Sequence, residues 1–135
     1  FLSAGPASLT LVNRTIPKAL ALSRQFERWG TRRAGGYRDF GGETFDIVVN
    51  ATSASLRGEL PPLDPYSFAR GALAYDLVYG KGQTPFLTLA INAGAGRLAD
   101  GVGMLVEQAA RAFEWWRGVR PSTAPLIEKL SVPLK

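Results

Sequence analysis

Three short and mostly apolar runs stand out along the chain, at residues 9–12, 45–49 and 73–78. Each run is bounded by residues that favour turns, which is typical of strands covered on both faces. The sequence therefore predicts three buried strands of a parallel sheet.

Between and after these runs, apolar residues recur at helical spacing. Residues 16–29 carry apolar side chains three or four positions apart, with Thr15 as N-cap, Pro17 in the first turn and Gly30 as the stop. The remaining predicted elements are helices near 84–94, 102–117 and 123–130, and a short strand near 96–98.

The helix at 102–117 has two stripes that tolerate non-polar contacts. Its core stripe consists of Val102, Leu105, Val106, Ala109, Phe113 and Trp116, and a second stripe, about 120° away at 100° per residue, consists of Gly101, Met104, Gln108 and Trp115. A helix with two such faces packs against the core with one face and contacts a second partner with the other. The second is either a ligand or a neighbouring domain against which Met104 and Trp115 pack.

Alternation of strands and helices predicts an α/β domain with a doubly wound, mostly parallel, Rossmann-like sheet. The first strand and the glycine-rich turn of such a sheet should precede residues 9–12. Instead, residues 1–5 are typical of the last turn of a helix with its glycine stop, and no G-x-G-x-x-G motif occurs; Gly94-Ala95-Gly96 matches it only in part. We therefore expect residues 1–135 to form one partial domain that lacks the first strand.

Composition excludes several kinds of chemistry. The chain has no cysteine and no histidine, so it can form neither a Ser-His-Asp triad nor a Cys/His zinc site, and we predict no metal. The net charge is +5, but Lys and Arg are scattered along the chain, so we expect no nucleic-acid partner. No apolar run is long enough to span a membrane and no secretion signal is visible, so we expect a cytoplasmic protein.

The turn after the first predicted strand carries positive charge where a dinucleotide-binding sheet meets the adenosine ribose. An acidic residue there selects NAD, whereas an Arg accommodates the extra phosphate of NADP. The residues here are Asn13-Arg14-Thr15-Ile16-Pro17-Lys18, without an acid. Arg14 and Lys18 can bind phosphate, and Asn13 and Thr15 can hydrogen-bond to it near a helix N-terminus. The alternative interpretation is an ordinary turn with an exposed Arg14.

Four segments together resemble the shikimate dehydrogenase family. They are Asn13-Arg14-Thr15-x-x-Lys18-Ala19, then residues 45–53 (FDIVVNATS), residues 75–87 (YDLVYGKGQTPFL) and residues 100–109 (DGVGMLVEQA). Each motif is weak alone, but their order and spacing cover essentially the whole chain.

The resemblance implies a role for each matching position. Asn13, Arg14, Thr15 and Lys18 correspond to the clamp on the adenosine 2′-phosphate, where the family often has Arg at the last position. Thr52 and Ser53 would line the cofactor crevice, although a polar turn after a buried strand remains the alternative. Leu77, Gly101 and Met104 would lie near the nicotinamide, and Tyr79 and Gln108 near the hydroxylated substrate ring. Lys81 is expected at the surface.

The resemblance also implies the activity of the whole enzyme. The family reversibly reduces 3-dehydroshikimate to shikimate with NADPH, in the shikimate pathway to chorismate and the aromatic amino acids. Its catalytic Lys and Asp belong to an N-terminal substrate domain. We therefore assign no catalytic residue here and expect the fragment to be inactive alone. A homodimer is a further expectation. Two alternatives stay open: a quinate/shikimate dehydrogenase with another cofactor preference, and a non-catalytic Rossmann-like interaction module whose unpaired sheet edge pairs with another chain.

Overall fold

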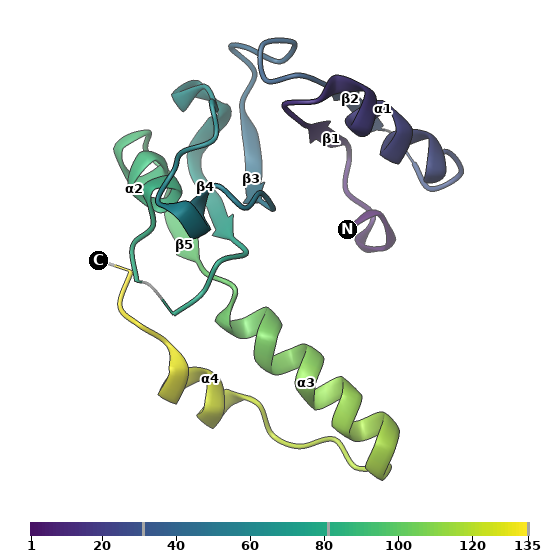
Figure 1. Ribbon diagram of the computed structural model, residues 1–135, viewed down its shortest axis with the longest axis vertical. Coiled ribbons are helices and arrows are strands. Elements are labelled where there is room, and N and C mark those ends of the chain that lie inside the picture. The colour runs from purple at the N-terminus through teal and green to yellow at the C-terminus, as the bar shows by residue number, and fades with distance from the viewer. Residues whose placement is uncertain (31, 81, 135) are drawn as a thin grey trace. The chain divides into compact units, whose positions relative to one another are not determined.

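The computed structural model describes residues 1–30, 32–80 and 82–134, shown as a ribbon in Figure 1. The chain divides into two compact units, residues 1–43 and residues 44–135.

The first unit is a parallel strand–helix–strand motif. It contains a 3-10 turn (Leu2–Ala4) that ends at the left-handed Gly5, then β1 (Leu9–Val12), α1 (Ile16–Gln25) and β2 (Arg32–Gly35). The strands β1 and β2 pair in parallel, from Leu9 opposite Arg32 to Val12 opposite Gly35. The predicted helix turn before the glycine stop and the predicted strand at 9–12 are both present.

Two predictions for this unit need correction. The helix begins as expected after Thr15, but it ends at Gln25 instead of continuing to residue 29. Phe26, expected inside the helix, is its C-cap, and Trp29 is 62% exposed. The strand β2 was not predicted, because Arg-Arg-Ala-Gly has neither apolar alternation nor β-branched residues; its pairing with β1 makes it a strand.

The second unit contains the three-stranded parallel sheet. Its strands are β3 (Phe45–Asn50), β4 (Phe68–Asp76) and β5 (Arg97–Ala99), in the order β3-β4-β5. Short 3-10 turns lie between β3 and β4, at Ser55–Arg57 and Pro65–Ser67. The third strand was predicted over residues 73–78. The observed strand β4 begins earlier, at Phe68, and ends at Asp76. Leu77 and Val78 therefore lie beyond the strand.

Three helices complete this unit, and all were predicted. They are α2 (Pro85–Asn92), α3 (Val102–Arg117) and α4 (Ala124–Leu130). The N-cap of α2 is Thr84, whose hydroxyl oxygen accepts a hydrogen bond from the Leu87 backbone. None of the helices in the described part of the chain is both long and apolar enough to cross a membrane.

The core of the second unit lies between the sheet and α2. Phe68, Ala72 and Ala74 of β4 pack against Phe86, Leu87 and Ala90 of α2. Small alanines on the strand allow the helix to approach closely, and the rings of Phe68 and Phe86 pack tilted with centroids 5.9 Å apart. Gly96, in the turn before β5, lies so close to Gly71 that a Cβ atom there would be 2.8 Å from the Gly71 Cα. Within the partial glycine motif at 94–96, Gly96 thus serves packing.

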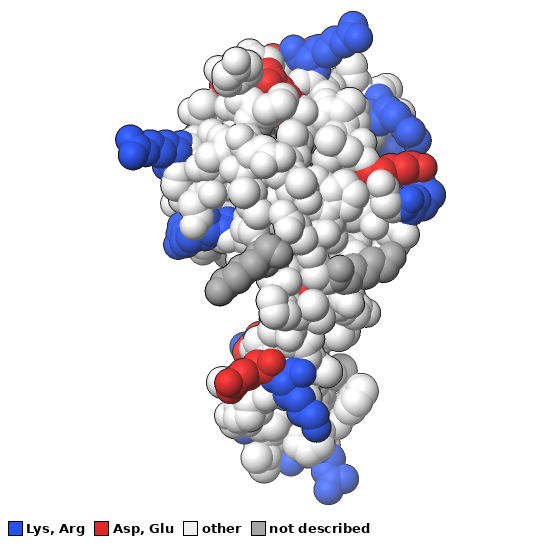
Figure 2. All heavy atoms as spheres, turned by 90° about the vertical axis from the view of Figure 1, so that its left-hand side faces the viewer, with Lys and Arg blue, Asp and Glu red and all other residues white. Residues whose placement is uncertain are grey.

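Polar contacts join α3 to α4. Glu107 accepts hydrogen bonds from Arg120 (2.6 Å) and from the Thr123 hydroxyl (2.6 Å). The guanidinium groups of Arg120 and Arg111 hold the pKa of Glu114 below its usual range. Figure 2 shows acidic and basic side chains next to each other over this part of the molecule.

The core stripe predicted for α3 is confirmed at Val102 and Val106, but the next buried residue is Ala110 rather than Ala109, and Phe113 and Trp116 are exposed.

The predicted α/β fold class is confirmed: every strand pair in the described ranges is parallel, α1 connects β1 to β2, and α2 connects β4 to β5. The strands form two separate parallel ladders, β1-β2 in the first unit and β3-β4-β5 in the second.

We predict that Phe86→Ala lowers the free energy of unfolding by about 3–5 kcal/mol, because it leaves a cavity between β4 and α2 where the side chain is 1% exposed. Chemical denaturation measures the loss. Tyr66→Ala, at a side chain that is 76% exposed, is the matched control and should change the stability by less than about 1 kcal/mol. Equal losses for both variants would contradict this core.

Candidate functional site

Candidate site residues lie at the carboxyl ends of the parallel strands in both units, where sheets of this type bind ligands. In the first unit they follow β1 and β2. In the second unit they follow β3 and β4 and begin α3.

The turn after β1 is fixed by local hydrogen bonds. The Asn13 backbone NH donates to the Gly35 carbonyl (3.1 Å), which extends the β1–β2 pairing by one residue. The Asn13 side-chain oxygen accepts from the Thr15 backbone NH (2.8 Å), so Arg14 lies at the tip of a tight turn. The Thr15 side chain makes no capping hydrogen bond to α1.

Arg14 and Lys18 are exposed, and neither forms an ion pair with any acidic residue that the structure describes. By contrast, Arg33, Arg57, Arg111 and Arg120 each bind a glutamate. The two cations of this turn are therefore available to an external anion at the N-terminus of α1. Their residue types fit the phosphate group of a dinucleotide.

The turn after β2 adds residues that sequence reasoning missed. Gly36 donates its backbone NH to the Asp39 carboxylate (2.7 Å), and Gly35 lies so close to that carboxylate that a Cβ atom would be 2.5 Å from its oxygen. Burial raises the pKa of Tyr37, and the positive charge of nearby Arg14 lowers it by less. Tyr37 thus lies near Arg14. In the sequence, the position of Tyr37 just after a strand is the signal that could have identified it, and the strand β2 was not predicted.

A buried polar cluster lies at the carboxyl ends of β3 and β4. Asn50 and Asp76, the last residues of the two strands, are opposite each other in the sheet and are 3% and 0% exposed. Asp76 accepts hydrogen bonds from the side chains of Asn50 (3.2 Å), Ser55 (2.7 Å) and Thr84 (2.6 Å). No described side-chain nitrogen or oxygen that is fully buried lacks a hydrogen-bond partner.

Thr52 and Ser53 follow this cluster, as the sequence predicts. The Thr52 hydroxyl donates to the Asn50 side-chain oxygen (2.8 Å) and accepts from the Ala54 backbone NH (3.2 Å). The Ser53 hydroxyl accepts from Arg57 (3.1 Å). The polar side chains at these positions therefore also shape the turn, and their contact with a cofactor stays a prediction.

Leu77, Tyr79 and Gly101 are brought together by the fold. Gly101 donates its backbone NH to the Val78 carbonyl (3.1 Å). A Cβ atom on Gly101 would lie 2.1 Å from the Leu77 carbonyl oxygen and 3.2 Å from the Tyr79 ring. The observed close approach at Gly101 is thus to this chain's own backbone, and an approach of the cofactor stays a prediction.

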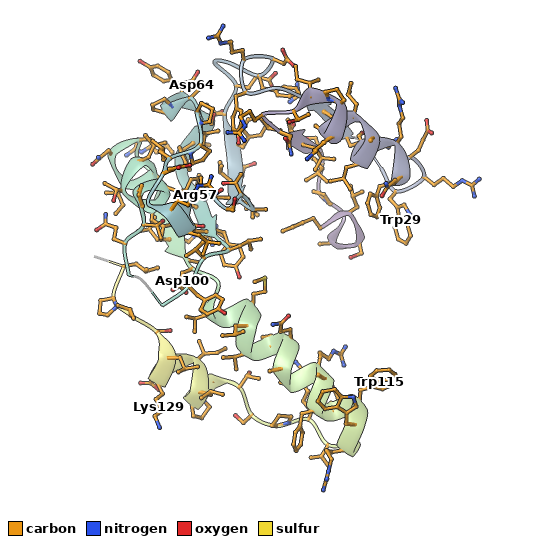
Figure 3. All side chains as sticks on the ribbon, in the orientation of Figure 1. Trp29, Arg57, Asp64, Asp100, Trp115 and Lys129 are labelled. Atoms are coloured by element: carbon orange, nitrogen blue, oxygen red, sulfur yellow. The ribbon has the colours of Figure 1, made fainter. Side chains whose placement is uncertain are left out.

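Asp100, labelled in Figure 3, anchors the same junction. Its carboxylate accepts from the Val102 backbone NH (3.1 Å) at the start of α3 and from the Gly80 NH (3.4 Å). Tyr75 reaches the same helix: its pKa is raised by burial, while a hydrogen bond with the Met104 backbone lowers it less. The start of α3 is therefore held against the segment after β4.

The second stripe of α3 is open to solvent beyond Gly101. Met104 is 40% exposed, Gln108 is exposed, and Trp115 is 86% exposed at the far end of the helix (Figure 3). The side chains of Gln108 and Tyr79 are therefore accessible to solvent. Their contact with a substrate stays a prediction. Lys81 lies outside the described residues. Among those described, no group of three or more potential Asp, Glu, Cys or His ligands could hold a metal ion.

The parallel ladders, with polar and cationic residues after their strands, define a Rossmann-like nucleotide-binding fold. Within this class, a family model described as the shikimate 5′-dehydrogenase C-terminal domain matches residues 101–130. The chain is 54% identical over 129 residues to a protein named shikimate dehydrogenase (NADP(+)) from Dechloromonas aromatica, covering 96% of this chain and 47% of that protein.

Solved structures agree with this relationship. A crystal structure of an Ael1 enzyme from Pseudomonas putida is 56% identical, with a TM-score of 0.94, and the match covers 100% of this chain and 49% of that one. A shikimate 5-dehydrogenase from Thermus thermophilus, in complex with NADP(H) and shikimate, is 29% identical with a TM-score of 0.71, covering 93% and 46%. The chain is thus related to shikimate dehydrogenases along nearly its whole length, which confirms the resemblance. It spans just under half the length of the relatives it matches.

We predict that Gly101→Ala destabilises the second unit by about 1–3 kcal/mol, because the new methyl group would overlap the Leu77 carbonyl. Gly103→Ala is the matched control, since a Cβ atom there meets nothing within 4 Å and the change should stabilise α3 by up to about 1 kcal/mol. Thermal denaturation compares the two variants. A Gly101→Ala protein as stable as Gly103→Ala would refute the tight junction.

Proposed function

We propose that this chain is the NADP-binding part of an NADP-dependent shikimate dehydrogenase, which interconverts 3-dehydroshikimate and shikimate. The observation that carries the proposal is the pair of exposed cations, Arg14 and Lys18, without a described acidic partner at the end of β1. The names of the relatives and the NADP(H) complex of the Thermus thermophilus enzyme support the same cofactor.

The residues of this chain have binding and orienting roles in the proposal. Arg14 and Lys18 hold the 2′-phosphate of the adenosine, with Asn13 and Thr15 as further hydrogen-bonding groups. Thr52, Ser53, Leu77, Gly101 and Met104 line the nicotinamide side, and Tyr79 and Gln108 contact the substrate hydroxyls. NADP held by these residues would supply the hydride chemistry, taking up a hydride from the carbon that carries the reacting hydroxyl in one direction and providing it to the carbonyl carbon in the other. The groups that exchange the hydroxyl proton are not assigned to this chain.

The proposal extends to features of the whole protein. It includes a substrate-binding domain outside this sequence, a cytoplasmic location and the option of a homodimer. Since the catalytic proton exchange requires that other domain, the 135-residue chain alone should be inactive.

An assay of the intact protein that contains this chain tests the proposal. Oxidation of shikimate with NADP should be faster than with NAD, and quinate is assayed in parallel. Turnover of quinate but not shikimate would favour the quinate alternative. Failure to bind NADP or 2′,5′-ADP would favour the non-catalytic module.

We predict that Arg14→Asp raises the Kd for NADP by about 10- to 100-fold in the intact protein, because it replaces a phosphate ligand with a repelling charge. Binding of NAD, which lacks the 2′-phosphate, should change by about twofold or less. Arg28→Asp, on an exposed arginine of the same unit, is the control for the change in net charge. Equal losses for NADP and NAD would contradict the clamp.

We predict that Gln108→Ala raises the KM for shikimate by about 10-fold, since the substrate loses one hydrogen-bonding partner, and leaves the Kd for 2′,5′-ADP unchanged. Steady-state kinetics and a binding titration give the two values. Gln25→Ala, at the exposed end of α1, should change neither. An unchanged KM would remove Gln108 from the substrate site.

A further inference from the structure

Asp76 is a carboxylate with no exposed surface that accepts four hydrogen bonds. One oxygen accepts from the hydroxyls of Ser55 (2.7 Å) and Thr84 (2.6 Å). The other accepts from the Asn50 side-chain amide (3.2 Å) and from the Val78 backbone NH (3.2 Å). Its hydrogen-bonding capacity is therefore filled by this chain alone.

The two hydroxyls are committed as donors to Asp76. The Ser55 hydroxyl oxygen already accepts from the Asn50 amide (2.9 Å), and the Thr84 hydroxyl oxygen accepts from the Leu87 backbone NH (3.3 Å). Each hydroxyl has one hydrogen, and in both cases the nearby acceptor is the Asp76 carboxylate. The network therefore has a single arrangement of donors and acceptors.

These donors flank the two segments that carry the candidate site residues of this unit. Asn50 and Ser55 lie immediately before and after residues 51–54, which include Thr52 and Ser53. Val78 lies between Leu77 and Tyr79, and Thr84 ends the connection to α2. One carboxylate thus holds both segments at the carboxyl edge of the sheet.

Further hydrogen bonds connect these two segments to neighbouring groups. The Asn50 side-chain oxygen accepts from the Thr52 backbone (3.1 Å) and hydroxyl (2.8 Å), so Thr52 depends on how Asn50 is oriented. The Val78 carbonyl, on the other side, accepts from Gly101 at the start of α3. A displacement of Asp76 would therefore move groups on both segments and at the helix start.

We propose that Asp76 is a positioning residue for the reaction, which sets the geometry between Thr52–Ser53 and Leu77–Tyr79. This inference rests on the proposed function, because it takes those segments to contact cofactor and substrate. Burying a carboxylate is costly unless it is fully hydrogen-bonded, and an apolar side chain of similar size would fill the space without fixing either segment. Asp76 acts through the residues that it orients and takes no part in proton transfer.

The test uses the intact protein that contains this chain. Asp76→Asn keeps the shape but places an amide NH₂ against two hydrogen-bond donors, so kcat/KM for shikimate should fall about 100-fold per folded active site. The Kd for 2′,5′-ADP, a probe of the Arg14 turn alone, should change by less than about twofold. Asp46→Asn, which removes the same charge from an exposed position of β3, is the control and should change neither value.

A second pair of variants covers the case in which Asp76→Asn does not fold. Thr84→Val removes one donor to Asp76 and should lower kcat/KM about 10-fold, and Thr84→Ser, which restores the hydroxyl, should recover it to within about threefold. A purely structural role would lower the melting temperature and the folded fraction but leave kcat and KM of the folded enzyme unchanged.

Two kinds of failure are distinguishable. If the wild-type protein neither binds 2′,5′-ADP nor oxidises shikimate, the proposed function is wrong and this inference is wrong with it. If the wild type is active but folded Asp76→Asn matches Asp46→Asn, or Thr84→Val matches Thr84→Ser in kcat and KM, the positioning role alone is overturned.

Discussion

The second unit depends on how a buried negative charge is accommodated between two parallel strands. Parallel strands bring their carboxyl ends to one edge of the sheet, where the chain must leave each strand in a turn. Asp76 stands at that edge without exposed surface, and its burial is tolerated because Asn50, Ser55, Val78 and Thr84 all donate to it. The same donors hold the turns in place, so the requirement to satisfy the carboxylate also shapes the candidate site.

The start of α3 adds a second constraint, which is steric. Gly101 packs directly on the Leu77 carbonyl, and its backbone NH is bonded to the Val78 carbonyl. The Asp100 carboxylate accepts hydrogen bonds from the Val102 NH at the start of the helix and from the Gly80 NH. The segment after β4 is therefore held from one side by the Asp76 cluster and from the other by α3. The backbone next to Tyr79 is therefore hydrogen-bonded on both sides, although the Tyr79 side chain is 47% exposed.

The first unit follows a different principle. Its candidate site carries two cations, Arg14 and Lys18, without an ion-pair partner among the described residues, whereas the second unit has a buried polar cluster around Asp76 in which every side chain is hydrogen-bonded. Arg33, next to β1 in the sheet, forms an ion pair with Glu43, whereas the turn at Asn13–Lys18 leaves Arg14 and Lys18 open to an external anion.

The sequence by itself determined what depends on neighbouring residues. The turn at 13–18, the N-cap position of Thr15 and the extent of α3 follow from short-range spacing, and the four family-like segments identified the relationship. Only the tertiary structure decided what depends on distant pairing. The strand β2 exists because β1 pairs with it, Asp76 meets Asn50, Ser55 and Thr84 across two connections, and Gly101 meets Leu77 through the sheet. These contacts join residues 8 to 26 positions apart, and no local periodicity encodes them.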